Sequence, residues 1–140
     1  MVFNKRVWFV FLITIVVLAC AANAAELQYK NYIAGSYVNK DSKAYISILN
    51  PSDTAATTEL FMYYEKNNSR KIDLKAEPNS VLMIDLANYA SAGAMFGAVV
   101  STDKPVYVSH VQYNGTYSAG FGSNAATKPG FVWYFAEGYT

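Results

Sequence analysis

Short segments of alternating apolar and polar residues, separated by turn-forming residues, run through most of this sequence. In residues 43–49, Ala44, Ile46 and Ile48 alternate with their neighbours, and the segment ends just before Pro51. A period of two is typical of β-strands with one buried face, and proline interrupts strand pairing. Comparable segments occur at 32–38, 57–64, 70–74, 81–86 and 106–113, and segment 95–102 is apolar on both faces, as in a central strand. The pattern predicts an all-β fold.

Close turns between such short strands are typical of an immunoglobulin-like antiparallel β-sandwich of about seven strands. The turn at 66–69 predicts a hairpin between its flanking strands. The short connection at 103–105 predicts a second antiparallel hairpin, between segments 95–102 and 106–113. Residues 115–130 are rich in Gly, Ser, Ala and Asn, and we expect a surface loop or linker there.

The N-terminal segment has the composition of an export signal. Lys5 and Arg6 precede the apolar run 7–18, and Ala22-Asn23-Ala24 provides small residues for cleavage. The apolar run is shorter than the ~20 residues of a membrane span. Residues 1–24 are therefore predicted to be a cleaved signal peptide, and the mature protein to be secreted or at the cell surface, including the outer envelope.

Cys20 is the only cysteine and lies within this export signal. A cysteine in such a segment usually serves only as a small apolar residue. However, Val17-Leu18-Ala19-Cys20 also resembles a bacterial lipoprotein cleavage site. Lipidation at Cys20 is the alternative, and the only predicted route to a membrane. Cleavage after Ala24 would leave a mature chain without cysteine or disulfide.

The C-terminal residues resemble the first predicted strand. Trp133 to Tyr139 reads Trp-Tyr-Phe-Ala-Glu-Gly-Tyr, and Tyr32 to Tyr37 has aromatic, alanine and tyrosine residues in the same order. Self-similarity at about the length of one domain is typical of tandem modules. The predicted organisation is a signal peptide, a β-sandwich module, a linker and the first strand of a following module, at 1–24, 25–114, 115–130 and 131–140.

Residues for catalysis are few. His110 is the only histidine, and Ser36, Ser47 and Asp85 are the residues that could join it in a Ser–His–Asp set. No Gly-x-Ser-x-Gly motif is present, so a strand histidine hydrogen-bonded at a sheet surface is the simpler interpretation. One histidine cannot form a transition-metal site. We therefore expect that the protein is not an enzyme and binds neither a metal ion nor a cofactor.

Charge and aromatic content restrict the partners. The formal net charge is +1, which provides no basic surface for nucleic acid. The chain has 12 tyrosines, and aromatic strand residues usually pack in the core or in cross-strand pairs. As an alternative, Tyr113, Tyr117 and Trp133 are candidates for stacking on the sugar rings of a polysaccharide.

The sequence resembles uncharacterised extracellular β-sandwich repeat modules of bacterial secreted or surface proteins, which carry a W-Y-F-A-E-G-Y motif like that at 133–139. Three further motifs match in order: Leu49-Asn50-Pro51, Pro78-Asn79-Ser80 and Asp103-Lys104-Pro105-Val106. The first copy departs from the pattern, because Gly35 stands where the second copy has Glu137. The resemblance implies architecture and location rather than an activity.

These observations together predict a non-catalytic structural or adhesive module, with neighbouring modules or cell-envelope components as partners. A carbohydrate-binding module is the first alternative. The second is a filament subunit, in which residues 131–139 self-associate by adding a strand to a neighbouring sheet.

Overall fold

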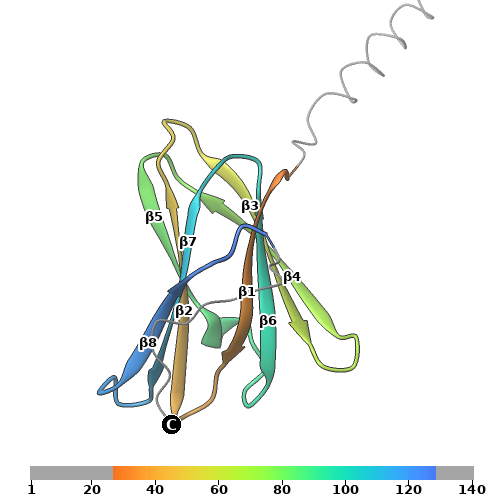
Figure 1. The fold of residues 1–140 in the computed structure, drawn as a ribbon, viewed down its shortest axis with the longest axis vertical. Coiled ribbons are helices and arrows are strands. Elements are labelled where there is room, and N and C mark those ends of the chain that lie inside the picture. Colours follow the sequence, from red (N-terminus) through yellow and green to blue (C-terminus); the bar gives the residue numbers. More distant parts are fainter. Residues whose placement is uncertain (1–26, 129–140) are drawn as a thin grey trace, which may run out of the picture.

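The structure, a computed structural model, describes residues 27–128 and consists of two four-stranded sheets packed face to face (Figure 1). One sheet has the order β1-β6-β3-β4, with β1 Tyr29–Tyr37, β6 Met95–Thr102, β3 Ala56–Tyr64 and β4 Ser69–Ala76. The other has the order β5-β2-β7-β8, with β5 Ser80–Asp85, β2 Ser42–Asn50, β7 Tyr107–Asn114 and β8 Gly120–Asn124. Every strand pairing is antiparallel. The predicted all-β antiparallel sandwich is confirmed, and its immunoglobulin-like character stays a prediction.

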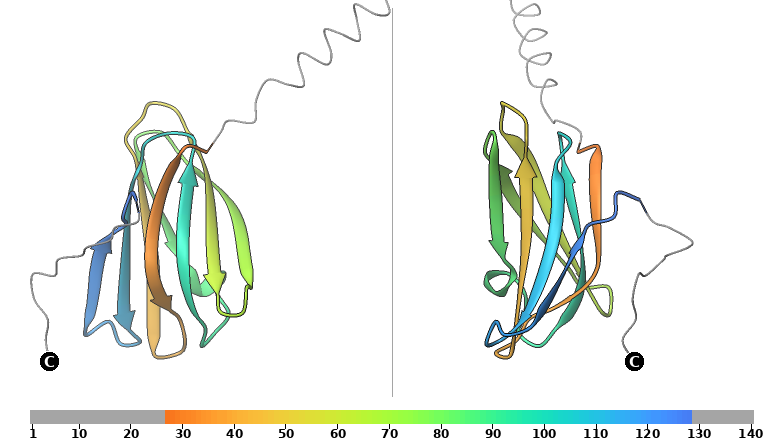
Figure 2. Two further views of the ribbon diagram at one scale, coloured as in Figure 1. Left: turned by 45° about the vertical axis from the view of Figure 1, so that its right-hand side comes forward. Right: turned by 60° about the vertical axis from the view of Figure 1, so that its left-hand side comes forward.

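Alternation along each strand determines which side chains enter the core. In β2, Ala44, Ile46 and Ile48 are buried, whereas Tyr45 and Ser47 lie on the outer side. The two layers enclose one apolar core between them (Figure 2). Its buried members are Ile33, Val38, Ala44, Ile46, Ile48, Ala56, Leu60, Met62, Ala76, Ile84, Leu86, Phe96, Ala98, Val100 and Val108.

The hairpin predicted at 66–69 is confirmed, since β3 and β4 pair antiparallel around it. The hairpin predicted around 103–105 is wrong, because β6 belongs to one sheet and β7 to the other. Packed sheets lie about 10 Å apart, a distance that four extended residues of about 3.3 Å each can cross. A short connection therefore suits a crossing between facing sheets as well as a hairpin.

The loop or linker predicted at 115–130 is wrong for residues 120–124. Residues 120–124 form β8, an eighth strand, and pair with β7 from Tyr113↔Gly120 to Ser109↔Asn124. The chain then crosses to the other sheet, where Ala126 exchanges two backbone hydrogen bonds with Tyr32 of β1, of 2.7 and 3.0 Å. Pairing with an existing strand edge, rather than intrinsic propensity, orders this small-residue segment.

A single turn of 3-10 helix, η1 (Leu86–Asn88), follows β5. Within residues 27–128 no helix is both long and apolar enough to cross a membrane. The predicted signal peptide at 1–24, Cys20, and the predicted strand 131–140 with Trp133 lie outside the described residues.

Candidate functional site

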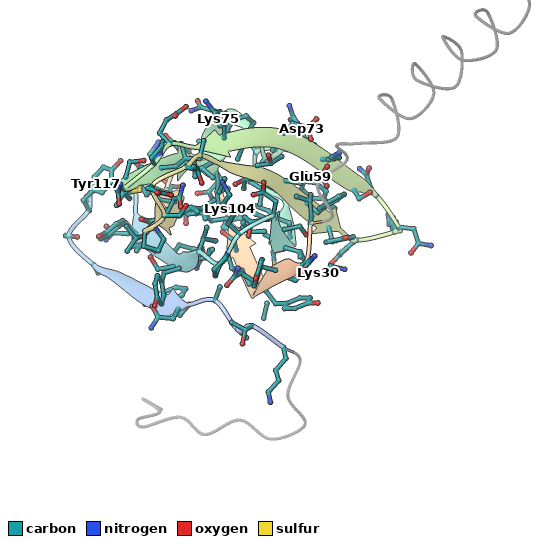
Figure 3. All side chains as sticks on the ribbon, turned by 90° about the horizontal axis from the view of Figure 1, so that it is seen from above. Lys30, Glu59, Asp73, Lys75, Lys104 and Tyr117 are labelled. Atoms are coloured by element: carbon teal, nitrogen blue, oxygen red, sulfur yellow. The ribbon has the colours of Figure 1, made fainter. Side chains whose placement is uncertain are left out.

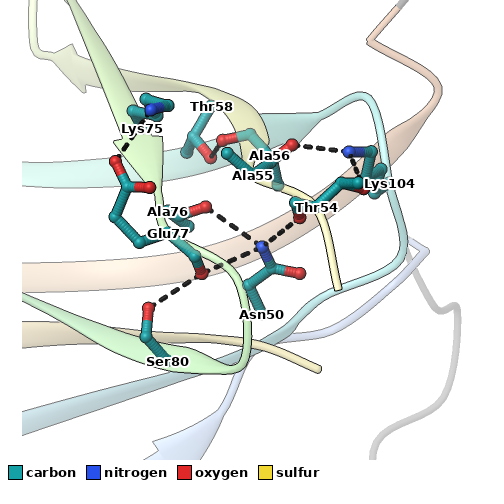
Figure 4. A network of polar contacts seen from close by, with 10 residues as sticks. All are labelled: Asn50, Thr54, Ala55, Ala56, Thr58, Lys75, Ala76, Glu77, Ser80 and Lys104. Atoms are coloured by element: carbon teal, nitrogen blue, oxygen red, sulfur yellow. Dashed lines mark hydrogen bonds and ion pairs between the residues drawn. The ribbon is translucent and has the colours of Figure 1, made fainter. Parts of the chain in front are cut away.

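Asn50 anchors a polar cluster at one end of the sandwich (Figure 4). Its side-chain Nδ2 donates to the carbonyl oxygens of Thr54, Ala76 and Glu77 at 2.9, 3.0 and 3.1 Å. Its Oδ1 accepts from the Ser52 backbone N–H and hydroxyl, at 3.1 and 2.6 Å. Asn50, the asparagine of the Leu-Asn-Pro motif, is fully buried. Its hydrogen bonds link the loop that precedes β3 to the loop that follows β4.

The Asp103-Lys104-Pro105 motif meets the same region (Figure 4). Lys104 Nζ donates to Thr54 Oγ1 at 2.6 Å and to the Ala55 carbonyl oxygen at 2.5 Å. Asp103 Oδ1 accepts from the Thr57 backbone N–H at 2.8 Å. These side chains hold backbone groups, and this polar cluster is therefore structural.

His110 faces the interior, where its Nε2 lies 3.1 Å from Ser36 Oγ. The ring is buried, and this burial lowers the pKa of His110 below its usual range. The expected position at a sheet surface is therefore wrong: β7 turns this side chain towards β1, which packs against it. Sequence reasoning could name Ser36 as a partner but could not select it.

The other two candidates do not join this pair. Ser47 pairs in register with Ser109, one position away from the Ile46↔His110 pair, so it points to the outer side of the sheet. Asp85 Oδ1 accepts from the Ala87 backbone N–H at 2.9 Å and caps η1. Ser36, Ser47, Asp85 and His110 thus form no catalytic triad. Within the described part of the chain, no three His, Cys, Asp or Glu residues are grouped to hold a metal.

The outer side of the β5-β2-β7-β8 sheet exposes several large apolar and tyrosine side chains. We call it the tyrosine face and define it by the outward residues of β2, β5 and β7 and one turn residue: Tyr45, Ser47, Leu49, Val81, Met83, Tyr107, Ser109, Val111, Tyr113 and Tyr117. Val81 is 56% exposed, Met83 62% and Tyr107 71%. Large exposed apolar patches on soluble domains mark interaction sites.

Three tyrosines gather at one end of this face. The Tyr113 and Tyr117 rings lie 5.6 Å apart between centroids, inclined at 51°. The Tyr45 and Tyr117 hydroxyls are 2.7 Å apart, and this hydrogen bond, with burial and nearby Asp85, raises the pKa of Tyr45 to about 12. The structure thus brings together the predicted Tyr113 and Tyr117. Sequence reasoning missed Tyr45, whose outward position follows from alternation but whose neighbours depend on strand order.

A shallow hollow of ≈ 270 Å³ lies beside these tyrosines. Its floor and walls are formed by Tyr45, Ser47, Met83, Val111 and Tyr113. Gly120 supports this arrangement, because a Cβ there would lie 2.5 Å from Cδ1 of Tyr113 and 2.6 Å from the Gln112 carbonyl oxygen. The hollow suits a protruding apolar group better than an ion, since its lining is almost wholly carbon.

The outer side of β3 and β4 carries more charge, although Phe61 and Tyr63 also point outward there, and we call Glu59, Lys71, Asp73 and Lys75 the charged face (Figure 3). Lys71 Nζ lies 2.5 Å from Glu59 Oε1 and 3.1 Å from Asp73 Oδ1. Hydrogen bonds to these two carboxylates raise the pKa of Lys71. These ion pairs satisfy the charges of this face at the surface.

No protein-family model and no curated protein sequence matches the chain. Among solved structures, the crystal structure of Thermotoga maritima 1070 is similar, with a TM-score of 0.65 and 12% identity over 71% of this chain and 94% of that one. The Anabaena sensory rhodopsin transducer is similar with a TM-score of 0.54 and 18% identity, over 59% of this chain and 85% of that one. At these identities the likeness concerns the fold alone.

Proposed function

We propose that this chain is a non-catalytic extracellular β-sandwich module, a structural or adhesive unit of a secreted or cell-envelope repeat protein. Its working surface is the tyrosine face. The module is a rigid two-layer body that presents this face to a neighbouring module or an envelope component. The buried polar cluster around Asn50 and the apolar core keep the body rigid.

The exposed apolar side chains of the tyrosine face carry this proposal. Leaving Val81, Met83 and Tyr107 in water forgoes about 25 cal/mol for each Å² of apolar area that burial would remove. A sequence that places ion pairs on β3 and β4 but leaves most outward positions of β2, β5 and β7 uncharged is suited to having the second surface covered by a partner.

A binding experiment tests the proposed working surface. Residues 25–140, which contain the whole described sandwich, are labelled and applied to cell envelopes of the producing bacterium. We expect binding that Met83→Glu reduces at least tenfold, because a charge would then be buried at the contact. Met95→Glu is the matched control, since Met95 is a similarly exposed strand methionine of the other sheet. Equal binding by both variants would refute a role for the tyrosine face.

The extracellular assignment is supported by the N-terminal sequence and needs its own measurement. Intact mass of the protein recovered from culture medium should match a chain that begins at Ala25. A diacylglycerol-modified chain that begins at Cys20 would instead identify a lipoprotein. A protein retained in the cell with residues 1–24 still attached would contradict export.

Polysaccharide binding is the second candidate, favoured by the exposed ring of Tyr117 beside that of Tyr113. Stacking of sugar rings on aromatic rings would use these two residues. Affinity electrophoresis in gels that contain soluble polysaccharides tests it. Retardation of the wild type that Tyr117→Ala abolishes, and that the control Tyr63→Ala on the other sheet retains, would promote this function.

A further inference from the structure

We propose that the tyrosine face binds a second copy of this chain, so that two modules pair face to face about a two-fold axis. The inference rests on the proposed function in one respect, namely that the tyrosine face is the working surface. It adds the identity of the partner, which the composition, the register and the size of the face indicate.

The composition of the tyrosine face favours a second copy as its partner. Among the described outward positions of β2, β5, β7 and β8, only Lys43 and Asp85 carry a charge. Both lie toward the same end of the sheet, since Lys43 pairs with Tyr113 and Asp85 with Tyr45. Interfaces between identical subunits are more apolar than contacts between independent proteins. A charge-free centre gives a different protein little to recognise electrostatically, but it suits a copy of itself.

The register of the strands allows two copies of the face to pair. Ser47 of β2 and Ser109 of β7 pair side by side near the centre of the face. Consider a two-fold axis that lies between the two facing sheets, parallel to the strands and over the line midway between β2 and β7. It places β2 of one copy over β7 of the other, as isologous contacts require. Leu49 then faces Tyr107 of the second copy, and Tyr45 faces Val111 of the second copy, which brings apolar groups together.

The same axis places β5 of one copy over β8 of the other. By register, Met83 of β5 then faces Asn124 of β8 in the second copy, and Asp85 faces Gly122, which has no side chain to collide with it. Lys43 faces Tyr113 of the second copy, where a lysine over an aromatic ring is attractive.

The size of the face suits a small, weak interface. Four strands spaced by about 4.8 Å and seven residues with a rise of about 3.3 Å each give a footprint of roughly 400 Å². Specific protein contacts bury about 600 to 1,000 Å² of accessible surface per partner. The flat footprint is below this range, and only the side chains that stand above the sheet bring the accessible area of the face towards its lower end. We therefore expect a weak dimer, with a dissociation constant on the order of micromolar.

Sedimentation velocity of residues 25–140 at about 1 to 500 µM, a range that brackets such a constant, tests the proposal. We expect the dimer fraction to rise with concentration. Met83→Glu should raise the dissociation constant at least tenfold, and Met95→Glu should leave it unchanged. Tyr107→Ser is a second variant on the tyrosine face in case Met83→Glu does not fold, which circular dichroism would reveal. It should weaken the dimer in the same direction.

A wild type that stays monomeric throughout this range overturns the proposal, and so does a dimer that neither Met83→Glu nor Tyr107→Ser weakens. The envelope-binding experiment separates this outcome from failure of the proposed function. A monomer that binds envelopes through Met83 would leave the function intact and refute only the second copy. A dimer sensitive to Met83 without envelope binding would support self-association and refute attachment to the envelope.

Discussion

The two outer surfaces of this sandwich rest on one core but differ in charge. On β3 and β4, Lys71 lies between Glu59 and Asp73 and forms an ion pair with each. On the opposite sheet, Met83 and Tyr107 extend apolar side chains into solvent. The inward residues of both sheets are alike, because both pack against the same interior. The difference shows that the core does not determine the outward residues, and it is the basis of our proposal that the tyrosine face meets a partner.

Both faces depend on the stability of the same sandwich, and we expect the largest loss of stability from a substitution at Asn50. Asn50→Ala removes an amide whose two hydrogens are shared among the carbonyl oxygens of Thr54, Ala76 and Glu77. Carbonyls left buried without donors should lower the free energy of unfolding by about 3 kcal/mol.

Urea-induced unfolding followed by far-ultraviolet circular dichroism measures this change. The control is Ser80→Ala, which removes one exposed hydrogen bond to the Glu77 carbonyl oxygen and should have a much smaller effect. Equal effects of the two substitutions would show that the buried amide has no special role.

The next prediction disturbs the tyrosine face alone. In Gly120→Ala, the added methyl group would overlap the Tyr113 ring and the Gln112 carbonyl oxygen. Overpacking of this kind should cost about 2 kcal/mol of unfolding free energy, and it should displace the Tyr113 ring. Gly35→Ala is the control, because no atom lies within 4 Å of a Cβ at that position. A well-tolerated Gly120→Ala would mean that Tyr113 is not held against β8.

A third prediction concerns the contact between the sheets, beneath both faces. Burial lowers the pKa of His110, so the unfolded chain binds a proton more readily than the folded one. This contribution to stability is fully present above a pH of about 6.5 and is lost as the pH falls towards the folded pKa. His110→Gln preserves a donor towards Ser36 Oγ but cannot be protonated.

Unfolding free energies measured across this range should therefore decline more steeply with acidification in the wild type than in His110→Gln. Parallel declines in the two proteins would show that another group controls the acid sensitivity.

The smallest effect is expected on the charged face. Lys71→Ala removes ion pairs with Glu59 and Asp73, but exposed pairs contribute little and are screened by salt. The midpoint of urea unfolding should stay within experimental error, and any difference should shrink as salt is added. A large, salt-insensitive loss would mean that the charged face also supports the fold, and the contrast with the tyrosine face would weaken.

Sequence patterns predicted the local structure of this chain well, and its pairings less well. Alternation placed Ala44, Ile46 and Ile48 in the core, because the side-chain direction in a strand depends on neighbouring residues only. The connection at 103–105 misled, since a short loop fits a hairpin and a sheet crossing equally. The segment 120–124 gave no strand signal at all, because its order comes from pairing with β7.

At the candidate site, too, the sequence indicated individual residues but not their neighbours. Tyr113 and Tyr117 were identifiable as aromatic residues with a possible binding role in the sequence, as was Ser36 as one partner of His110. Their actual neighbours were not. Tyr45 reaches Tyr117 only because β2 lies beside β7, and Ser36 reaches His110 only because β1 packs on that sheet.

The sequence by itself determined that the chain forms strands, where most of them begin and end, and which side of each is apolar. These properties arise from interactions among residues close together in the chain. Only the tertiary structure decided which strands are neighbours, and thus that ion pairs gather on one outer surface and tyrosines on the other. Strand order brings together residues that are distant in sequence. It follows from the free energy of the whole packed sandwich, which no single segment determines.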